Sequence, residues 1–151
     1  MQRKIFRLVE KHLYNQSAIE SAVKNAREEQ VIGRASRIGG GGSGHAFISD
    51  PTASIAIKFA TPIRSVRVEG MGVVYQPEQW IRVMNAAYQG QPEWLRKLLK
   101  KRYYYHTNSV QYLAIEYNLS LSGCYNLCHE FVVDVALRAM SESIIKYMED
   151  K

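Results

Sequence analysis

The stretch SVQYLAIEYNLSLSGCYNLCHEFVVDVAL, residues 109–137, decides the expected fold of this chain. Its apolar residues recur at helical spacing on both sides of Asn118-Leu119-Ser120. The pattern predicts a short helix over 109–117, a turn, and a long helix from 121 to about 148. Two helices joined by so tight a turn are typical of a helix-turn-helix.

Three side chains meet the requirements of that motif. Ala114 is small enough to let the two helices cross closely, and Leu119 supplies an apolar residue for the turn. Ser120 can cap the second helix, because its hydroxyl accepts a hydrogen bond from a free backbone N–H. The expected buried face of the second helix contains Cys124, Leu127 or Cys128, Phe131 and Val135.

The opposite face of the second helix, near its N-terminus, carries uncharged side chains that can reach base edges in a major groove. Asparagine in particular can bind adenine through two hydrogen bonds. The candidate DNA-binding residues on this face are Ser120, Leu121, Ser122, Gly123, Tyr125, Asn126 and His129.

Phosphate contacts are expected from outside this helix, because it has no lysine or arginine before Arg138. The preceding helix ends in a basic run, whose candidates are Lys97, Lys100, Lys101 and Arg102. The N-terminal helix offers a second basic face with Arg3, Lys4, Arg7 and Lys11, although a solvated helix face is the simpler interpretation there.

The upstream sequence divides into three further segments. Residues 1–32 predict a helical segment that breaks near Tyr14, with Ser17 capping its second piece and an apolar face of Ile5, Leu8, Val9 and Leu13. Residues 33–48 form a glycine-rich linker; the run lacks the Gly-Lys-Ser/Thr of a phosphate-binding loop. Residues 49–76 predict a helix that starts at Asp50 and ends at Thr61-Pro62, followed by a β-hairpin across Gly70-Met71-Gly72.

Residues 77–151 are expected to form one helical domain that contains the helix-turn-helix. Pro77 and Pro92 each open a helix, the first closed by Gly90, and Trp80 and Trp94 are expected in the core. The run Tyr103-Tyr104-Tyr105 has two interpretations: the edge of a core, which we favour, or a surface that stacks on unpaired bases. The predicted fold class is therefore mainly α with one small β-hairpin.

The composition fits a cytoplasmic nucleic-acid-binding protein. The formal net charge is +6, and the basic residues gather in 1–37 and 77–102, whereas 103–137 contain none. A basic chain favours an anionic partner but does not prove one. The sequence shows no apolar run long enough for a membrane span and no secretory signal at its N-terminus.

Catalytic and metal-binding motifs are lacking, so neither an enzyme nor a cofactor is expected. Cys124 and Cys128 lie one helical turn apart but make at most half of a zinc site, and two buried thiols are the preferred interpretation. Cys124 or Cys128 could act as a nucleophile pair with His129 only in a fold that bends the two side chains together, and mid-helix geometry opposes this.

Residues 93–140 resemble the C-terminal part of the RinA/ArpU family of phage late-gene transcription regulators. The resemblance is carried by Leu113, Ala114, Leu119 and Ser120, and extends upstream to Ser49-Asp50-Pro51-Thr52 and Pro77-Glu78-Gln79-Trp80. It implies a helix-turn-helix like region 4 of sigma factors, double-stranded DNA as the partner, and activation of late genes from bacteriophage promoters.

One departure from that family leaves other functions open. Recognition helices in the family usually carry arginine or lysine, which this helix lacks. The alternatives are a Q-type antiterminator that loads onto RNA polymerase or its sigma factor, and a small terminase-like protein that packages DNA. A homo-oligomer is compatible with each, and a ring of many subunits would favour packaging.

Overall fold

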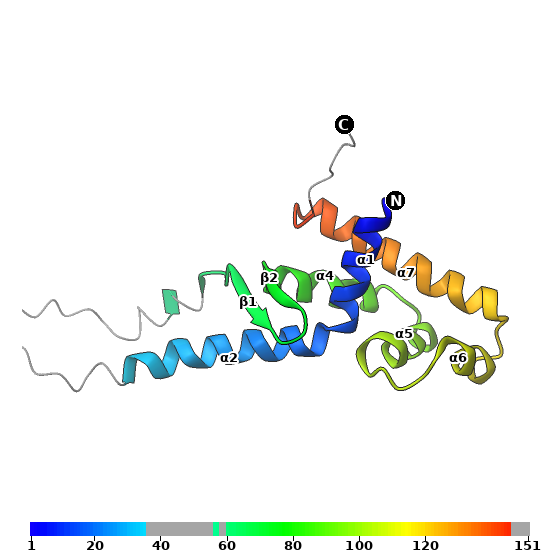
Figure 1. Cartoon of the computed structure of the whole chain (residues 1–151), viewed down its shortest axis with the longest axis horizontal. Helices are drawn as coiled ribbons and strands as arrows, with labels where there is room; N and C mark the ends of the chain where they lie inside the picture. The colour runs from blue at the N-terminus through cyan, green and yellow to red at the C-terminus, as the bar shows by residue number, and fades with distance from the viewer. Residues whose placement is uncertain (36–55, 58–59, 146–151) are drawn as a thin grey trace, which may run out of the picture. The chain divides into compact units, whose positions relative to one another are not determined.

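The computed structural model describes residues 1–35, 56–57 and 60–145 of this chain. It is mainly helical with one two-stranded antiparallel sheet, which confirms the predicted fold class (Figure 1). The chain divides into two compact units. The helical unit comprises Met1–Ala18 and Gln79–Lys151, and the hairpin unit comprises Ile19–Glu78.

The predicted break in the N-terminal helix is present, but its position differs from the expectation. Helix α1 spans Arg3–Tyr14 and helix α2 spans Gln16–Ala35, so the two are separated by Asn15 alone. Ser17 therefore lies inside α2, and its expected role as the capping residue is wrong. Leu8 is also not part of the buried face: it is 42% exposed.

Helix α2 extends three residues into the segment predicted as a linker. The rest of that glycine-rich linker and the start of the helix predicted from Asp50 lie outside the described residues. Ala56, Ile57 and Ala60 are helical, and the N–H of Thr61 donates to the carbonyl of Ile57 at 3.0 Å. The helix ends there, as the Thr61-Pro62 pair predicted.

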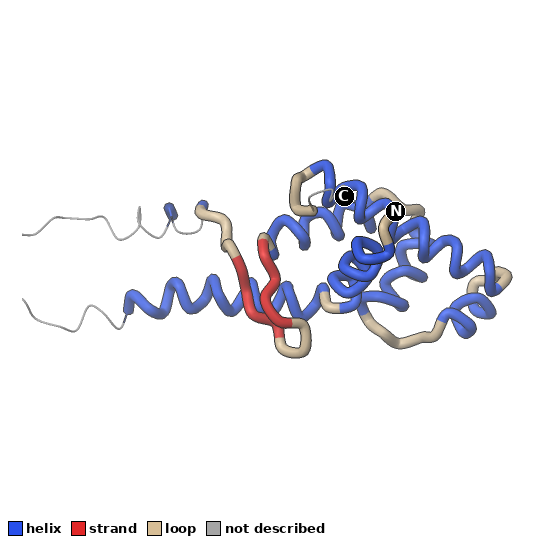
Figure 2. Tube along the Cα trace, turned by 45° about the horizontal axis from the view of Figure 1, so that its top comes forward, coloured by secondary structure: helices blue, strands red, loops and turns tan. Residues whose placement is uncertain are grey.

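The predicted hairpin is confirmed (Figure 2). Strand β1 spans Ser65–Val68, strand β2 spans Gly72–Tyr75, and Val66 pairs with Val74. Gly70 and Gly72 have positive φ angles of 75° and 93°, which glycine adopts without strain. Alternation places Val66, Val68 and Val74 on the buried face.

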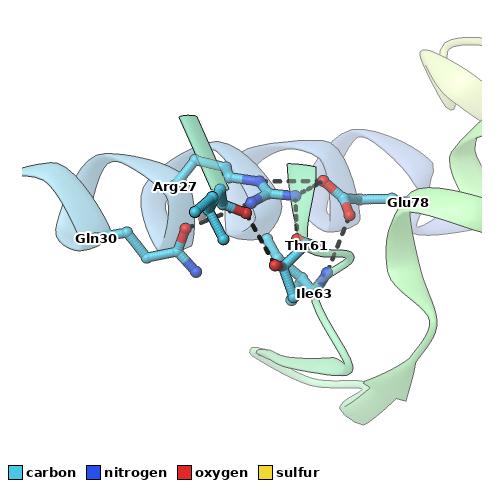
Figure 3. Close-up of polar contacts among 6 residues, drawn as sticks. Arg27, Gln30, Thr61, Ile63 and Glu78 are labelled. Carbon is cyan, nitrogen blue, oxygen red and sulfur yellow. Dashed lines mark hydrogen bonds and ion pairs between the residues drawn. The ribbon is translucent and has the colours of Figure 1, made fainter. Parts of the chain in front are cut away.

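A polar cluster within the hairpin unit joins α2 to the segment that enters the hairpin (Figure 3). The Arg27 guanidinium donates to the Glu78 carboxylate at 2.7 and 3.1 Å and to the Thr61 carbonyl at 3.0 Å. The second Glu78 oxygen accepts from the N–H of Ile63 at 3.0 Å. Since the Arg27 side chain is only 15% exposed, these bonds are shielded from water and fix the local chain path.

The helical unit contains the remaining helices. They are α4 (Pro77–Gln89), α5 (Glu93–Leu99), the π-helical turn η1 (Lys100–Tyr104), α6 (Val110–Glu116) and α7 (Leu121–Ser141). Both α1 and α6 pack against α7. The core includes Phe131 of α7, whose ring lies 4.8 Å from Tyr88 of α4 and 6.2 Å from Tyr103 of η1.

Two expectations for this unit are wrong. Helix α7 ends at Ser141 instead of continuing to about residue 148, because Ser143 adopts a positive φ of 58° and the N–H of Ile144 turns back to the Ala139 carbonyl. Trp94 lies on the surface with 46% exposure, whereas Trp80 is buried as expected.

His12 occupies a buried position beside Trp80. The two rings stack with centroids 4.0 Å apart, and Nδ1 of His12 lies 2.7 Å from the carbonyl oxygen of Leu8. A carbonyl only accepts, so Nδ1 carries the proton and the neutral ring is satisfied on that side. Burial lowers the pKa of His12 below its ordinary value of 6.5.

The depressed pKa of His12 predicts that the free energy of unfolding decreases as the pH is lowered. Below about pH 6.5 the unfolded chain takes up a proton at His12 that the folded chain takes up only at lower pH, so the free energy of unfolding decreases there. Urea unfolding between pH 7.5 and 5 measures this decrease. In His12→Gln the decrease should be smaller; an identical pH profile would remove His12 as its source.

The Arg27 cluster predicts a local loss of stability in Arg27→Ala. Without the guanidinium, Glu78 and the Thr61 carbonyl lose their partners, and we expect a cost of about 1–3 kcal/mol. Amide hydrogen exchange in β1 and β2 reports it. The matched control, Arg64→Ala, removes an exposed arginine of the same unit and should change exchange little. Equal effects of the two substitutions would contradict the structural role of the cluster.

Candidate nucleic-acid interface

Helices α6 and α7 form the predicted helix-turn-helix arrangement. Four residues, 117–120, separate the end of α6 from the start of α7, and the two helices pack against each other. Leu113 and Ala114 of α6 are buried, so the small side chain is at the contact where the motif requires it. Leu119 is half-buried in the turn.

The backbone of the turn is held by the hydrogen bonds of a Schellman motif. Asn118 adopts a left-handed conformation with φ of 53°. The N–H of Leu119 donates to the Ala114 carbonyl at 2.8 Å, and the N–H of Asn118 donates to the Ile115 carbonyl at 3.2 Å. These bonds satisfy two carbonyls that the end of α6 leaves free. Asparagine tolerates this conformation better than most residues, which explains its place here.

Serine caps begin both helices of the motif. The Ser109 hydroxyl accepts from the N–H of Tyr112 at 3.3 Å, and the Ser120 hydroxyl accepts from the N–H of Gly123 at 3.0 Å. A Cβ at position 123 would lie 2.8 Å from the Ser120 oxygen. Gly123, which was predicted as a DNA contact, therefore also gives the Ser120 cap the space it needs.

The two faces of α7 separate as predicted. The buried residues are Cys124, Cys128, Phe131, Val132, Val135, Ala136 and Ala139, so Cys128 and not Leu127 belongs to the core. The exposed face at the start of the helix presents Leu121, Ser122, Tyr125, Asn126 and His129. Six of the seven predicted base-contacting residues, Ser120 included, are thus exposed, and Gly123 is half-exposed.

The two cysteines are free and buried, as predicted. Burial raises the pKa of Cys128 to about 11 and also raises the pKa of Cys124, so both thiols are protonated at neutral pH. Within the described ranges, no group of three or more His, Cys, Asp or Glu side chains is arranged to hold a metal ion.

An unexpected feature of the interface is the position of α1 beside the exposed face of α7. The Phe6 ring stacks on His129 with centroids 4.7 Å apart. A cavity of about 300 Å³ opens next to this stack. Its lining comes from α1, η1 and α7: Phe6, Glu10, Arg102, Tyr103, Tyr125, Asn126, Cys128 and His129. Three of the seven predicted base-contacting residues, Tyr125, Asn126 and His129, therefore border a groove with α1 on its other side.

The four basic residues predicted as phosphate contacts do not form one cluster. Lys97 pairs with Glu93 at 2.8 Å, and Lys101 pairs with Glu116. Lys100 lies 5.7 Å from the centroid of the Tyr88 ring. All these side chains stay partly or wholly exposed, but two of them already have an acidic partner.

Arg102 is the one member of that predicted set that borders the groove. Its guanidinium lies over the rings of Tyr14 and Tyr103, at 5.8 and 5.4 Å, and its Nε is buried without a hydrogen-bond partner in the described part of the chain. The π-helical turn directs it there: the N–H of Tyr105 bonds to the Lys100 carbonyl, five residues back.

The tyrosine run divides between core and surface. Tyr103 is buried, Tyr104 is half-buried, and Tyr105 is 59% exposed. This gradient confirms the favoured interpretation of the run as the edge of a core. Tyr105 is the most solvent-exposed tyrosine of the run.

Sequence reasoning missed Phe6 and Glu10. Phe6 lies at the edge of the apolar stripe of α1, and Glu10 belongs to no recognisable sequence motif. The spacing of Arg3, Phe6, Arg7 and Glu10, three or four residues apart, was the available signal that they share a face.

Comparisons with known proteins give no match: no family model, no curated protein and no solved structure is similar to this chain at a significant level. Among the described residues, none of the helices is both long and apolar enough to cross a membrane.

The left-handed turn residue predicts a specific pattern of substitutions. Asn118→Ala should lower the free energy of unfolding by about 1 kcal/mol, because alanine resists a positive φ. Asn118→Gly should be close to neutral, since glycine accepts that conformation. Urea unfolding of both variants tests the turn. Equal losses would show that the asparagine side chain, and not the backbone conformation, matters.

Proposed function

We propose that this chain binds double-stranded DNA through the start of α7 and regulates transcription. The observation that carries the proposal is the pairing of a capped, tightly turned α6–α7 motif with an exposed polar face at the start of its second helix. Helices presented in this way enter the major groove and contact bases with their first turns.

The exposed face provides chemistry for base recognition. Asn126 can bind adenine through two hydrogen bonds, and Ser122 can donate to or accept from several bases. Tyr125 is 47% exposed and combines an apolar ring with a hydroxyl. The resemblance of residues 93–140 to the RinA/ArpU regulators makes phage late-gene promoters the proposed sites of action.

A second candidate function is action together with bacterial RNA polymerase, as in Q-type antiterminators. Two observations favour it. Residues 121–137 of α7 contain no lysine or arginine, which limits the affinity of this helix for DNA. Two apolar side chains of α6, Tyr112 and Ile115, are 55% and 81% exposed and offer a surface to a protein partner.

A binding selection from random duplexes tests the proposal. The purified chain is used alone and again with RNA polymerase holoenzyme. Enrichment of one sequence by the chain alone is the expected result. Enrichment only with polymerase would favour the second candidate, and no enrichment in either experiment would contradict both.

Asn126 is the side chain expected to determine sequence preference. Asn126→Ala should reduce discrimination at one base pair of the selected site by about 1–3 kcal/mol while non-specific binding stays nearly constant. Asn25→Ala, which removes an exposed amide of α2, is the matched control. Fluorescence anisotropy on the selected duplex and on single-base variants gives both quantities. Equal losses on all duplexes would assign Asn126 a structural role instead.

A further inference from the structure

Helix α1 carries a stripe of four residues next to its buried face. Ile5, Val9, His12 and Leu13 are buried and fix the orientation of the helix in the unit. Arg3, Phe6, Arg7 and Glu10 recur at spacings of three and four, so they lie along one side of α1. We call these four residues the α1 stripe.

Two members of the α1 stripe, Phe6 and Glu10, lie beside the exposed face of α7. Phe6 stacks on His129 at 4.7 Å, and Phe6 and Glu10 line the groove together with Tyr125 and Asn126. The far end of α1 is held as well, because the Tyr14 ring lies 5.0 Å from Tyr103. Phe6 and Glu10 are thus held beside Tyr125, Asn126 and His129.

The charges of the unit make this stripe a source of phosphate contacts. Lys97 and Lys101 are paired with acidic side chains, and α7 has no cation before Arg138. Arg3 and Arg7 are exposed, and neither forms an ion pair with any residue that the structure describes. An arginine that has no acidic partner can bind a phosphate without first breaking an existing ion pair.

We propose that Arg3 and Arg7 bind the phosphates of double-stranded DNA beside the bases that α7 contacts. This inference rests on the proposed function. It makes the interface a composite in which α7 supplies uncharged side chains for base recognition and α1 supplies positive charge. Glu10 lies in the same stripe and opposes the phosphates, so it weakens DNA binding.

The test compares two double substitutions within the same helix. Arg3→Ala/Arg7→Ala removes two charges from the stripe. Lys4→Ala/Lys11→Ala removes two charges from the flank of α1 that lies beyond Arg7 and farther from Phe6, where both lysines are exposed. Affinity of the full chain for its selected duplex, or for a generic duplex, is measured by anisotropy from 50 to 300 mM salt.

For the arginine pair we expect the slope of log affinity against log salt to fall by about 1.8, which is about 0.9 for each phosphate contact. The lysine pair should change the slope by much less. Arg3→Lys/Arg7→Lys keeps both charges and should retain most of the slope. This control distinguishes the loss of positive charge from a disruption of the fold as the cause of a smaller slope. Glu10→Gln should tighten binding.

The outcomes separate this inference from the proposed function. If the unmodified chain binds no duplex, with or without polymerase, the proposed function fails. If it binds, and the arginine and lysine pairs lower the slope equally, the stripe has no special role and the inference is overturned. Weaker or unchanged binding by Glu10→Gln would also contradict the inference.

Discussion

The packing of Phe131 is the interaction on which the helical unit depends. Its ring contacts Tyr88 of α4 and Tyr103 of η1, so one side chain joins three elements in the core. Burial of this face of α7 decides which residues remain on the other face. The apolar side of α7 is buried in the core, so the polar side chains at the start of the same helix are exposed. One face of α7 therefore packs in the core, and the opposite face is the one proposed to contact DNA.

The same packing explains why the interface is made from distant parts of the sequence. Tyr103 contacts Phe131 on one side and Tyr14 of α1 on the other, so η1 links the N-terminal helix to α7. Phe6 then reaches His129, which brings α1 alongside the proposed base-contacting face. The proposed base-contacting part of α7 has no lysine or arginine before Arg138, and α1 is the neighbouring helix proposed to supply positive charge.

Local features were predictable from the sequence, and long-range ones were not. Ser120 and the positive-φ glycines of the hairpin act through hydrogen bonds or dihedrals within a few residues. The stack of Phe6 on His129 joins residues far apart in the chain, and no periodicity encodes it. Trp94 was placed in the core because of its size, yet α5 presents it to solvent. The early end of α7 depends on the conformation of Ser143, a residue without a strong preference for positive φ.

We infer that α7, with α1 beside it, forms the proposed DNA-binding surface of this chain. Amide chemical shifts of the labelled full chain, recorded during titration with a duplex, test it most directly. The largest changes are expected in residues 3–10 and 121–129, with the hairpin at 65–75 nearly unchanged. Changes concentrated in the hairpin, or the absence of changes in α7, would contradict it.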